Sequence, residues 1–244
     1  MVFSSIPFLY YFLPAVLAVY FLTPRKGKNA VLLLASLIFY GWGELRLLPL
    51  MVFTILLCYV CGLGIERSRS RKKLWLLASI VISVGLLGVF KYADFFIGSL
   101  NAVTGLKIPL PHLALPVGIS FYTFQCLSYT IDVYRGSVPA QKSLINFGAY
   151  VALFPQLIAG PIVRYADIAR ELEHREHSWD NAAAGLRRFL VGLGKKVILA
   201  DNFALLIRLF RQSGETSVLF YWMYAVAFAL NIYFDFSGYS DMAI

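Results

Sequence analysis

Long apolar runs separated by short charged segments dominate the first part of the chain. The runs cover residues 7–22, 30–42, 47–65 and 74–90, and Pro14 interrupts the first of them. A membrane-spanning helix needs roughly 20 mostly apolar residues, so the second run is short for a full span. Neighbouring helices of a bundle can accommodate a proline such as Pro14. The pattern therefore predicts an all-α fold, a polytopic bundle of transmembrane helices.

The charged segments between these runs indicate how the chain crosses the membrane. Segments 25–28 and 66–73 are strongly basic, with Arg25, Lys26, Lys28, Arg67, Arg69, Arg71, Lys72 and Lys73 against Glu66. Cytoplasmic loops are enriched in Lys and Arg, so both segments are predicted to be cytoplasmic. The two runs between them then form an out-and-back hairpin, and the N-terminus lies outside. No positive side chain precedes the first run, which we therefore interpret as a retained span rather than a signal peptide.

Prolines interrupt the apolar segments in the middle of the chain. Residues 108–117 contain three prolines, which predict a loop or a re-entrant turn. Segments 117–131 and 144–162 are further membrane segments, and Pro155 and Pro161 break the second. Broken helices at membrane depth are tolerated where protein buries them or where they line a cavity. We therefore expect broken or re-entrant helices around an internal cavity.

The segment 164–211 is more polar and contains a helical pattern. Apolar side chains recur at helical spacing, at Leu186, Phe189, Leu190, Leu193 and Val197. The basic residues fall largely on the other side of this helix: Arg187, Arg188, Lys195 and, near the border, Lys196. The pattern predicts an interfacial amphipathic helix with a basic side. Two interpretations stay open, because this side could bind anionic lipid headgroups or hold the phosphates of an acyl donor in the cytoplasm.

The composition agrees with a membrane protein and excludes other classes. Of the 244 residues, 59% are hydrophobic and 14% are charged, whereas soluble domains average about 45–50% apolar and about 25% charged residues. The 22 basic and 13 acidic residues give a net charge of +9, but the basic residues stand in short clusters rather than in the stripe that nucleic-acid binding needs. Cys58, Cys61 and Cys126 lie in apolar runs and are predicted to pack as small hydrophobic residues. Membrane lipid, and no nucleic acid, is therefore the expected partner.

Polar residues next to or within the apolar runs are candidates for function, because ionisable groups are costly at membrane depth. Asp132 and Arg135 form one set, although residues three apart on a helix could simply neutralise each other. Gln156 and Arg164 form a second set, although an arginine can also extend to the headgroups. The third set follows the last apolar run, at residues 217–233, and consists of Asp235, Ser237, Tyr239 and Asp241. These sets indicate a polar passage without naming its reaction.

The third set allows more specific predictions. Asp235 and Asp241 are six positions apart, which places them about 120° apart around a continuous helix, so they are not expected to share a proton. Asp235 could cap a helix that begins near Ser237, and Gly238 could allow two backbones to approach closely.

The three histidines suggest neither a metal site nor a catalytic base. His112 stands in the proline-rich segment with no nearby acid, and His174 and His177 lie in a charged stretch that we expect to be solvated. A metal site needs more ligands than this pair offers. No residue of the chain is therefore assigned as catalytic or as a metal ligand.

Several motifs resemble one family closely. Leu-Pro-Val-Gly-Ile-Ser-Phe-Tyr-Thr-Phe-Gln at 115–125, with Ile-Asp-Val-Tyr-Arg-Gly at 131–136, is similar to the signature of the alginate O-acetyltransferase branch of the membrane-bound O-acyltransferases. Further similar blocks, in the order found in the family, occupy residues 1–5, 154–161, 194–201 and 233–244. The signal is weaker for the substrate, since relatives acylate alginate, cellulose, peptidoglycan or teichoic acid.

The resemblance implies a multi-pass enzyme of the bacterial inner membrane with a central tunnel. Residues 1–244 would be the N-terminal portion of one membrane domain, without a bound cofactor. The enzyme would move an acetyl group from a cytoplasmic donor such as acetyl-CoA to hydroxyls of an extracytoplasmic polysaccharide such as alginate, together with extracytoplasmic partner proteins.

The resemblance also implies where the catalytic residue lies. The family's catalytic histidine belongs to a Trp-Arg-Arg-Trp-His-type block downstream of the block at 233–244, so it is expected beyond Ile244. Residues 1–244 alone are therefore expected to be inactive. A non-catalytic scaffold and a transporter are the alternative interpretations.

Overall fold

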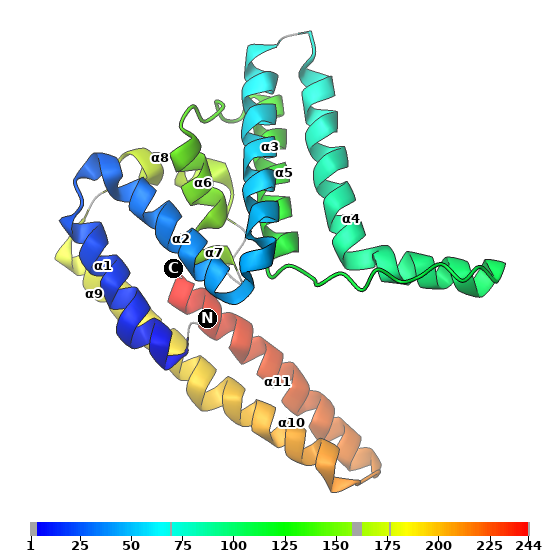
Figure 1. Cartoon of the computed structure of the whole chain (residues 1–244). Helices are drawn as coiled ribbons and strands as arrows, with labels where there is room; N and C mark the ends of the chain where they lie inside the picture. Colours follow the sequence, from blue (N-terminus) through cyan, green and yellow to red (C-terminus); the bar gives the residue numbers. More distant parts are fainter. Residues whose placement is uncertain (1–3, 69, 158–162, 176, 244) are drawn as a thin grey trace. The chain divides into compact units, whose positions relative to one another are not determined.

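The computed structural model of the chain describes residues 4–68, 70–157, 163–175 and 177–243 (Figure 1). Over these residues the regular structure is helical, without strands. Three helical stretches in this part of the chain are long and apolar enough to cross a membrane: Arg25–Arg67, Lys72–Thr104 and Val218–Ala243. The predicted all-α membrane fold is therefore confirmed.

The described residues form two compact units. The larger unit contains residues 18–157 and 163–175, and the smaller unit contains residues 4–17 and 177–243. The division falls within α1 (Leu13–Leu22), which follows the π-helical turn η1 (Phe8–Phe12) directly. Pro14 follows this turn within one continuous helical stretch, and local π-helical adjustments of this kind allow a membrane helix to accommodate a proline. The prediction of one membrane domain over residues 1–244 stays a prediction.

The larger unit consists of helices that differ widely in length. In chain order they are η2 (Arg25–Gly27), α2 (Lys28–Glu44), η3 (Leu45–Leu47), α3 (Leu48–Arg67), α4 (Lys72–Thr104), α5 (Ile119–Arg135), α6 (Leu144–Ala152), α7 (Phe154–Leu157) and α8 (Tyr165–Glu173). Helices α3, α4 and α5 pack side by side (Figure 1).

Two helices of this unit extend beyond the apolar runs that predict them. The short run 30–42 is part of the 17-residue helix α2, because the helical course includes the flanking polar residues Lys28, Asn29 and Glu44. The run 74–90 is part of the 33-residue helix α4, which continues to Thr104. No proline interrupts residues 91–104, and the helix ends where Gly105 adopts a φ of 72°, a conformation that favours glycine.

The predicted irregular segments of the larger unit are confirmed where the structure describes them. Residues 106–116 contain no helix. The segment 144–162 breaks at Leu153, whose ψ is 111°, and Pro155 stands in the first turn of the new helix α7. The backbone N–H of Phe154, at this break, donates to Ser36 Oγ at 3.1 Å and is therefore satisfied. Pro161 lies outside the described residues.

Buried aromatic rings form the centre of the larger unit. The ring of Tyr129 lies 4.6 Å from that of Phe147 and 5.1 Å from that of Tyr165, and the ring of Tyr150 lies 5.3 Å from that of Tyr165. Gln141 joins them, since its backbone N–H donates to Tyr129 Oη at 2.9 Å and its Nε2 donates to Tyr165 Oη at 2.8 Å. This set of five residues is called the aromatic core below.

The three cysteines also lie in the larger unit, and they pack there as small hydrophobic residues, as the sequence predicts. Cys58, Cys61 and Cys126 are buried as free thiols. Within the described residues, no group of three or more His, Cys, Asp or Glu side chains is arranged to hold a metal ion.

The smaller unit is built around a helical hairpin. Its first arm runs without a loop through α9 (Trp179–Gly194), the π-helical segment η4 (Lys195–Ala200) and α10 (Asp201–Ser213), and α11 (Val218–Ala243) returns beside it (Figure 1). Ser178 caps α9 by accepting a hydrogen bond from the backbone N–H of Asn181, as expected of a serine at this position.

The orientation of the amphipathic helix differs from the simplest expectation. The segment is helical, but Leu186, Leu190 and Val197 are exposed, whereas Lys195 and Lys196 bind carboxylates within the protein. Lipid tolerates exposed apolar side chains, so the polar side can turn inward to α11.

Candidate functional site

Two glycines bring the arms of the hairpin into close contact. A Cβ atom on Gly192 would lie 2.6 Å from the backbone oxygen of Gly238, and a Cβ on Gly238 would lie 2.8 Å from the backbone oxygen of Gly192. No larger residue fits at either position without a shift of the backbone. The predicted role of Gly238 in close backbone approach is therefore confirmed, and Gly192 is a partner that sequence reasoning missed. Small residues at such crossings are typical of membrane helix pairs.

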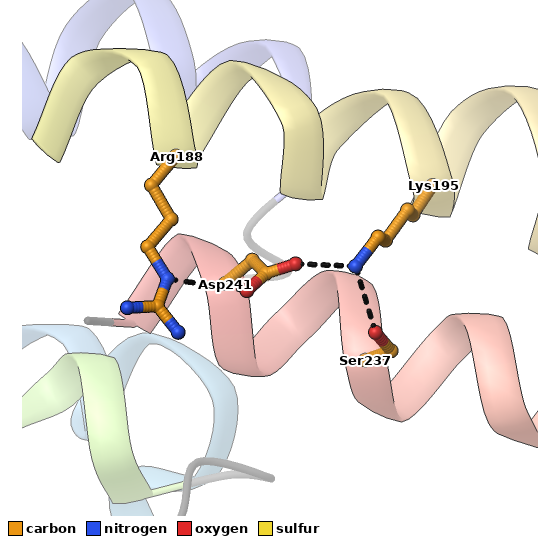
Figure 2. A network of polar contacts seen from close by, with 4 residues as sticks. All are labelled: Arg188, Lys195, Ser237 and Asp241. Carbon is orange, nitrogen blue, oxygen red and sulfur yellow. Dashed lines mark hydrogen bonds and ion pairs between the residues drawn. The ribbon is translucent and has the colours of Figure 1, made fainter. Parts of the chain in front are cut away.

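Lys195 is the centre of one polar network at this crossing. Its Nζ donates to Asp241 Oδ2 at 2.6 Å and to Ser237 Oγ at 3.0 Å, as Figure 2 shows. Arg188 Nε donates to Asp241 Oδ1 at 3.2 Å, so two cations from one arm share one carboxylate of the other. The Asp241 side chain is only 18% exposed. Charge-assisted hydrogen bonds of this kind are stronger than neutral ones.

Lys196 forms a second network one residue further on. Its Nζ lies 2.6 Å from Asp235 Oδ1 and 3.1 Å from Asp201 Oδ1. Burial alone would lower the pKa of Lys196, but the hydrogen bonds and charges of Asp235 and Asp201 outweigh burial and raise this pKa above its ordinary value. Lys196 therefore stays charged at neutral pH.

Together the two networks place three cations against three carboxylates. They are Arg188, Lys195 and Lys196 on the first arm, Asp201 on that same arm, and Asp235 and Asp241 on α11. We call these six residues, with Ser237, the charged crossing. Its formal charges cancel, which lowers the cost of holding them between apolar helices.

The sequence predicted only part of this arrangement. Asp235 does not cap a helix that begins near Ser237, because α11 begins at Val218 and continues through both residues. The predicted separation of Asp235 and Asp241 is confirmed, since each binds a different lysine. Tyr239 lies on the same helix between them.

Asp201 and Asn231 are polar residues that sequence reasoning missed. Asn231 Nδ2 donates to the backbone oxygen of Ala200 at 2.7 Å, next to Asp201. A signal was present in the sequence, because Asn231, Asp235, Gly238 and Met242 recur at spacings of four, three and four, as residues of one helix face do.

The remaining candidates lie outside the charged crossing. Gln156 (α7) and Arg164, the residue before α8, belong to the larger unit. Gln156 Oε1 is buried and has no hydrogen-bond partner among the described residues, whereas Arg164 is exposed. Arg187 is exposed on α9, and its role as a phosphate ligand stays a prediction.

The catalytic histidine is expected beyond Ile244 and therefore outside residues 1–244. Helix α11 is described as far as Ala243, and Ile244 lies outside the described residues. The expectation of a catalytic histidine beyond Ile244 therefore stays a prediction.

Two further sequence predictions can be compared with contacts in the larger unit. Among the ion pairs of the described residues there is none between Asp132 and Arg135. The prediction that no acid lies near His112 is wrong, because His112 Nδ1 lies 3.4 Å from Asp94 Oδ2. The loop folds back along α4, so an acid distant in sequence becomes a neighbour.

The chemistry of the charged crossing is that of an ion-paired polar site between apolar helices. Its lysines and arginine are donors for an anionic or polar group, and its carboxylates and Ser237 Oγ are acceptors. Ionisable side chains at membrane depth are characteristic of polar pathways and functional sites. These features define an integral membrane protein with a polar site in its helical bundle.

The comparisons with known proteins identify the family. A model of the MBOAT, membrane-bound O-acyltransferase, family matches residues 34–244, and the chain belongs to this family. It is 43% identical over 252 residues to the probable alginate O-acetylase AlgI of Azotobacter vinelandii, covering 100% of this chain and 50% of that protein. It is 33% identical over 279 residues to the peptidoglycan O-acetyltransferase of Helicobacter pylori, covering 100% of this chain and 53% of that protein.

A more distant relative extends the range of acceptors. The chain is 25% identical over 149 residues to the teichoic acid D-alanyltransferase of Bacillus subtilis, covering 57% of this chain and 38% of that protein. The chain spans about half the length of the curated relatives that it matches along its whole length. The names of these relatives share the transfer of an acyl group to alginate, peptidoglycan or teichoic acid.

Proposed function

We propose that the whole protein is an O-acetyltransferase of the bacterial inner membrane, which transfers acetyl from a cytoplasmic donor such as acetyl-CoA to hydroxyls of an extracytoplasmic polysaccharide. The observation that carries the proposal is the charged crossing within a chain of the membrane-bound O-acyltransferase family. The names of the relatives favour alginate or a similar polymer as the acceptor, presented with the help of extracytoplasmic partner proteins.

In this proposal, α11 contributes the polar side of the passage through which the acyl group moves. Asp235, Ser237, Tyr239 and Asp241 line it, and Gln156 and Arg164 are proposed as further members on the strength of the sequence. The ion pairs of Lys195 and Lys196 support this role, because they hold the carboxylates of α11 in fixed positions. A passage built from fixed charges would orient a polar thioester without reorganisation.

The basic residues have a second proposed role at the cytoplasmic end of this passage. Arg187, Arg188, Lys195 and Lys196 would bind the phosphates of the donor. Arg188 favours this role, because its side chain is 50% exposed while it contacts Asp241 at 3.2 Å. A phosphate would then compete with the carboxylate of Asp241 for the arginine, and the outcome would depend on donor concentration.

The catalytic base is proposed to lie in the family's Trp-His block, beyond Ile244, rather than in residues 1–244. A hydroxyl acceptor needs a group that takes its proton. Within the described structure, neither His112 nor His174 belongs to the charged crossing. The 244-residue chain expressed alone should therefore not acetylate a polymer, and acetyl transfer by it would overturn this placement of the base.

The proposal is tested by neutral substitutions in the full-length protein. Lys195→Gln and Asp241→Asn should each reduce polymer acetylation by at least about tenfold, the effect of about 1.4 kcal/mol on a barrier, while membrane insertion is retained. Arg208→Gln is the matched control, because Arg208 is exposed on α10 and outside the charged crossing. Acetylation is measured as ester content of the polymer, and insertion as protein in washed membranes.

The outcomes separate function from folding. Loss of acetylation with normal insertion in the two variants, and normal acetylation in Arg208→Gln, supports the passage. Normal acetylation in both Lys195→Gln and Asp241→Asn contradicts it. If either variant fails to insert, the double variant Lys195→Gln with Asp241→Asn, which removes both charges of this pair and leaves only the half-exposed Arg188 without its carboxylate, decides the question.

A further inference from the structure

The helix α4 is longer than a bilayer requires. Its 33 residues correspond to about 50 Å, whereas the hydrocarbon core is about 30 Å thick, so roughly a dozen residues lie beyond a span that begins at Lys72. Figure 1 shows that α4 is bent: its C-terminal part runs across the direction of its first part. Residues 105–117 then return along this bent part.

Two side chains of α4 fix the returning segment. Asn101 binds Ile108 twice, because its Nδ2 donates to the backbone oxygen of Ile108 at 2.8 Å and its Oδ1 accepts from the backbone N–H of Ile108 at 3.1 Å. Asp94 binds His112, whose backbone N–H donates to Asp94 Oδ1 at 3.1 Å. Asp94 and Asn101 are seven residues apart and so lie on one face of the helix. We call residues 92–117, which are the end of α4 together with the returning segment, the α4 extension.

The opposite face of the helix end is apolar and uncovered. Tyr92, Phe96, Leu100 and Val103 lie at roughly 160–240° around the helix from Asp94, and their exposed fractions are 43%, 64%, 46% and 86%. The returning segment therefore covers one face, and four large apolar side chains form a stripe on the other. Such a stripe in water would be an association site.

We infer that the α4 extension lies in the membrane interface. Its stripe is inserted between the lipid headgroups and the acyl chains of the leaflet opposite the 66–73 loop. Three observations support lipid as the occupant. The stripe continues directly from the lipid-exposed surface of α4, where Leu74, Leu77 and Val81 are also exposed. The bend turns the end of α4, which carries the stripe, away from the direction of the span (Figure 1).

The third observation is the composition of the returning segment. It also exposes apolar side chains, at Leu106, Leu110, Leu113 and Leu115. It has few polar groups, of which His112 pairs with Asp94 and Lys107 has a long side chain that can extend to the headgroups. Exposed apolar side chains with a few polar ones are typical of segments that lie in the interface plane, where apolar side chains insert by about 5–10 Å. A stripe built to dock a protein would not need to begin at the end of a span.

The inference is tested by spin-label accessibility in the full chain, reconstituted in vesicles of phosphatidylcholine and phosphatidylglycerol. Phe96→Cys and Val103→Cys carry the label on the stripe, and Lys107→Cys is the matched control on the returning segment. The natural cysteines are at most 2% exposed, so the spin-label reagent is expected to react only with the introduced cysteine. Relaxation is measured with oxygen, which partitions into lipid, and with a water-soluble nickel chelate.

The two reagents distinguish the possible occupants. The oxygen-to-nickel ratio should be several-fold higher at positions 96 and 103 than at position 107. A ratio at positions 96 and 103 as low as that of a label in water would show that the stripe is in water and overturn the inference. Protection of 96 and 103 from both reagents would show that protein, such as a second copy of the chain, covers the stripe, and would overturn it as well.

Discussion

The aromatic core and the charged crossing stabilise membrane helices in different ways. In the aromatic core, rings and one glutamine fill the space between α5, α6 and α8, and the hydrogen bonds join neutral groups. In the charged crossing, two glycines bring backbones together and all of the main polar contacts are ionic. The difference indicates that one region is built for packing and the other retains charges at a cost that packing alone does not require.

The two regions also differ in how much of their apolar helices is buried by other parts of the protein. The most apolar part of Arg25–Arg67 is 39% buried within the protein, whereas that of Val218–Ala243 is 6% buried. Within its own unit, helix α11 therefore has little protein around it apart from the first arm of the hairpin. Its charged contacts carry much of what fixes its position, while α5, α6 and α8 are fixed mainly by the packed side chains of the aromatic core. Helix α4 of the larger unit is also largely uncovered, with 11% of its most apolar part buried.

The largest effect is expected from removal of a ring in the aromatic core. Tyr129→Ala removes a fully buried ring and the acceptor for the backbone N–H of Gln141. The free energy of unfolding should fall by about 3–5 kcal/mol, as for other large aromatic residues replaced by alanine. Unfolding in mixed detergent micelles, followed by circular dichroism, measures the change.

A conservative variant shows whether volume or hydrogen bonding dominates in the aromatic core. Tyr129→Phe keeps the ring and leaves the Gln141 N–H without its acceptor, so a loss of about 1–3 kcal/mol is expected. Equal losses for Tyr129→Phe and Tyr129→Ala would mean that the core depends on its hydrogen bonds, and the contrast with the charged crossing would weaken.

A smaller effect is expected from a methyl group at the charged crossing. Gly192→Ala places a Cβ 2.6 Å from a backbone oxygen and 2.9 Å from Asp241 Cβ, so the arms must separate and the ion pairs lengthen. Overpacking of this kind costs about 1–3 kcal/mol. The same unfolding measurement applies.

Gly185→Ala is the matched control on the same helix. A Cβ there meets no atom within 4 Å, so the variant should gain about 0.5–1 kcal/mol from the better helix former. If Gly192→Ala also stabilises the protein, the arms are not in tight contact, and the ion pairs alone hold the crossing.

The apolar runs allowed the helices to be predicted, because a span is a local property of about 20 residues. The pairing of helices was not predictable in the same way. Arg188 and Asp241 are 53 positions apart. Their contact depends on the turn between α10 and α11 and on two glycines that no local pattern pairs. The helical pattern of residues 186–197 showed which residues share a face, but not whether that face meets lipid or protein.

The end of α4 is a second region that the local sequence pattern did not predict. Residues 91–104 are less regular in hydropathy, so their helical course was not predicted, and side chains of this part of α4 bind the segment that follows it, as Asn101 binds Ile108. His112 was interpreted without its acid for the same reason, since Asp94 is 18 positions away. Tertiary contacts therefore decided what local composition left open.

The smallest effect is expected from Asp201, the carboxylate of the second network that lies on the same arm as Lys196. Asp201 and Asp235 are similarly exposed, at 51% and 49%, but the contact of Asp201 with Lys196 Nζ is longer, at 3.1 Å, and does not join the two arms. Asp201→Asn should therefore change the free energy of unfolding by less than about 1 kcal/mol. Asp235→Asn should have a larger effect, because it removes the 2.6 Å contact between the arms. Equal effects would mean that the network acts through its summed charge rather than through its geometry.

The pH dependence distinguishes these two cases. A lysine whose pKa is raised on folding contributes stability that is complete below its ordinary pKa of 10.5 and is lost as the pH rises through the raised value. Lys196 should therefore lose its contribution only above pH 10.5 in the natural protein, and Asp235→Asn should move this loss to lower pH. Asp201→Asn should move it less, because the hydrogen bond to Asp235 remains. An equal displacement in both variants, measured as unfolding free energy against alkaline pH, would contradict a dominant role for the contact between Lys196 and Asp235.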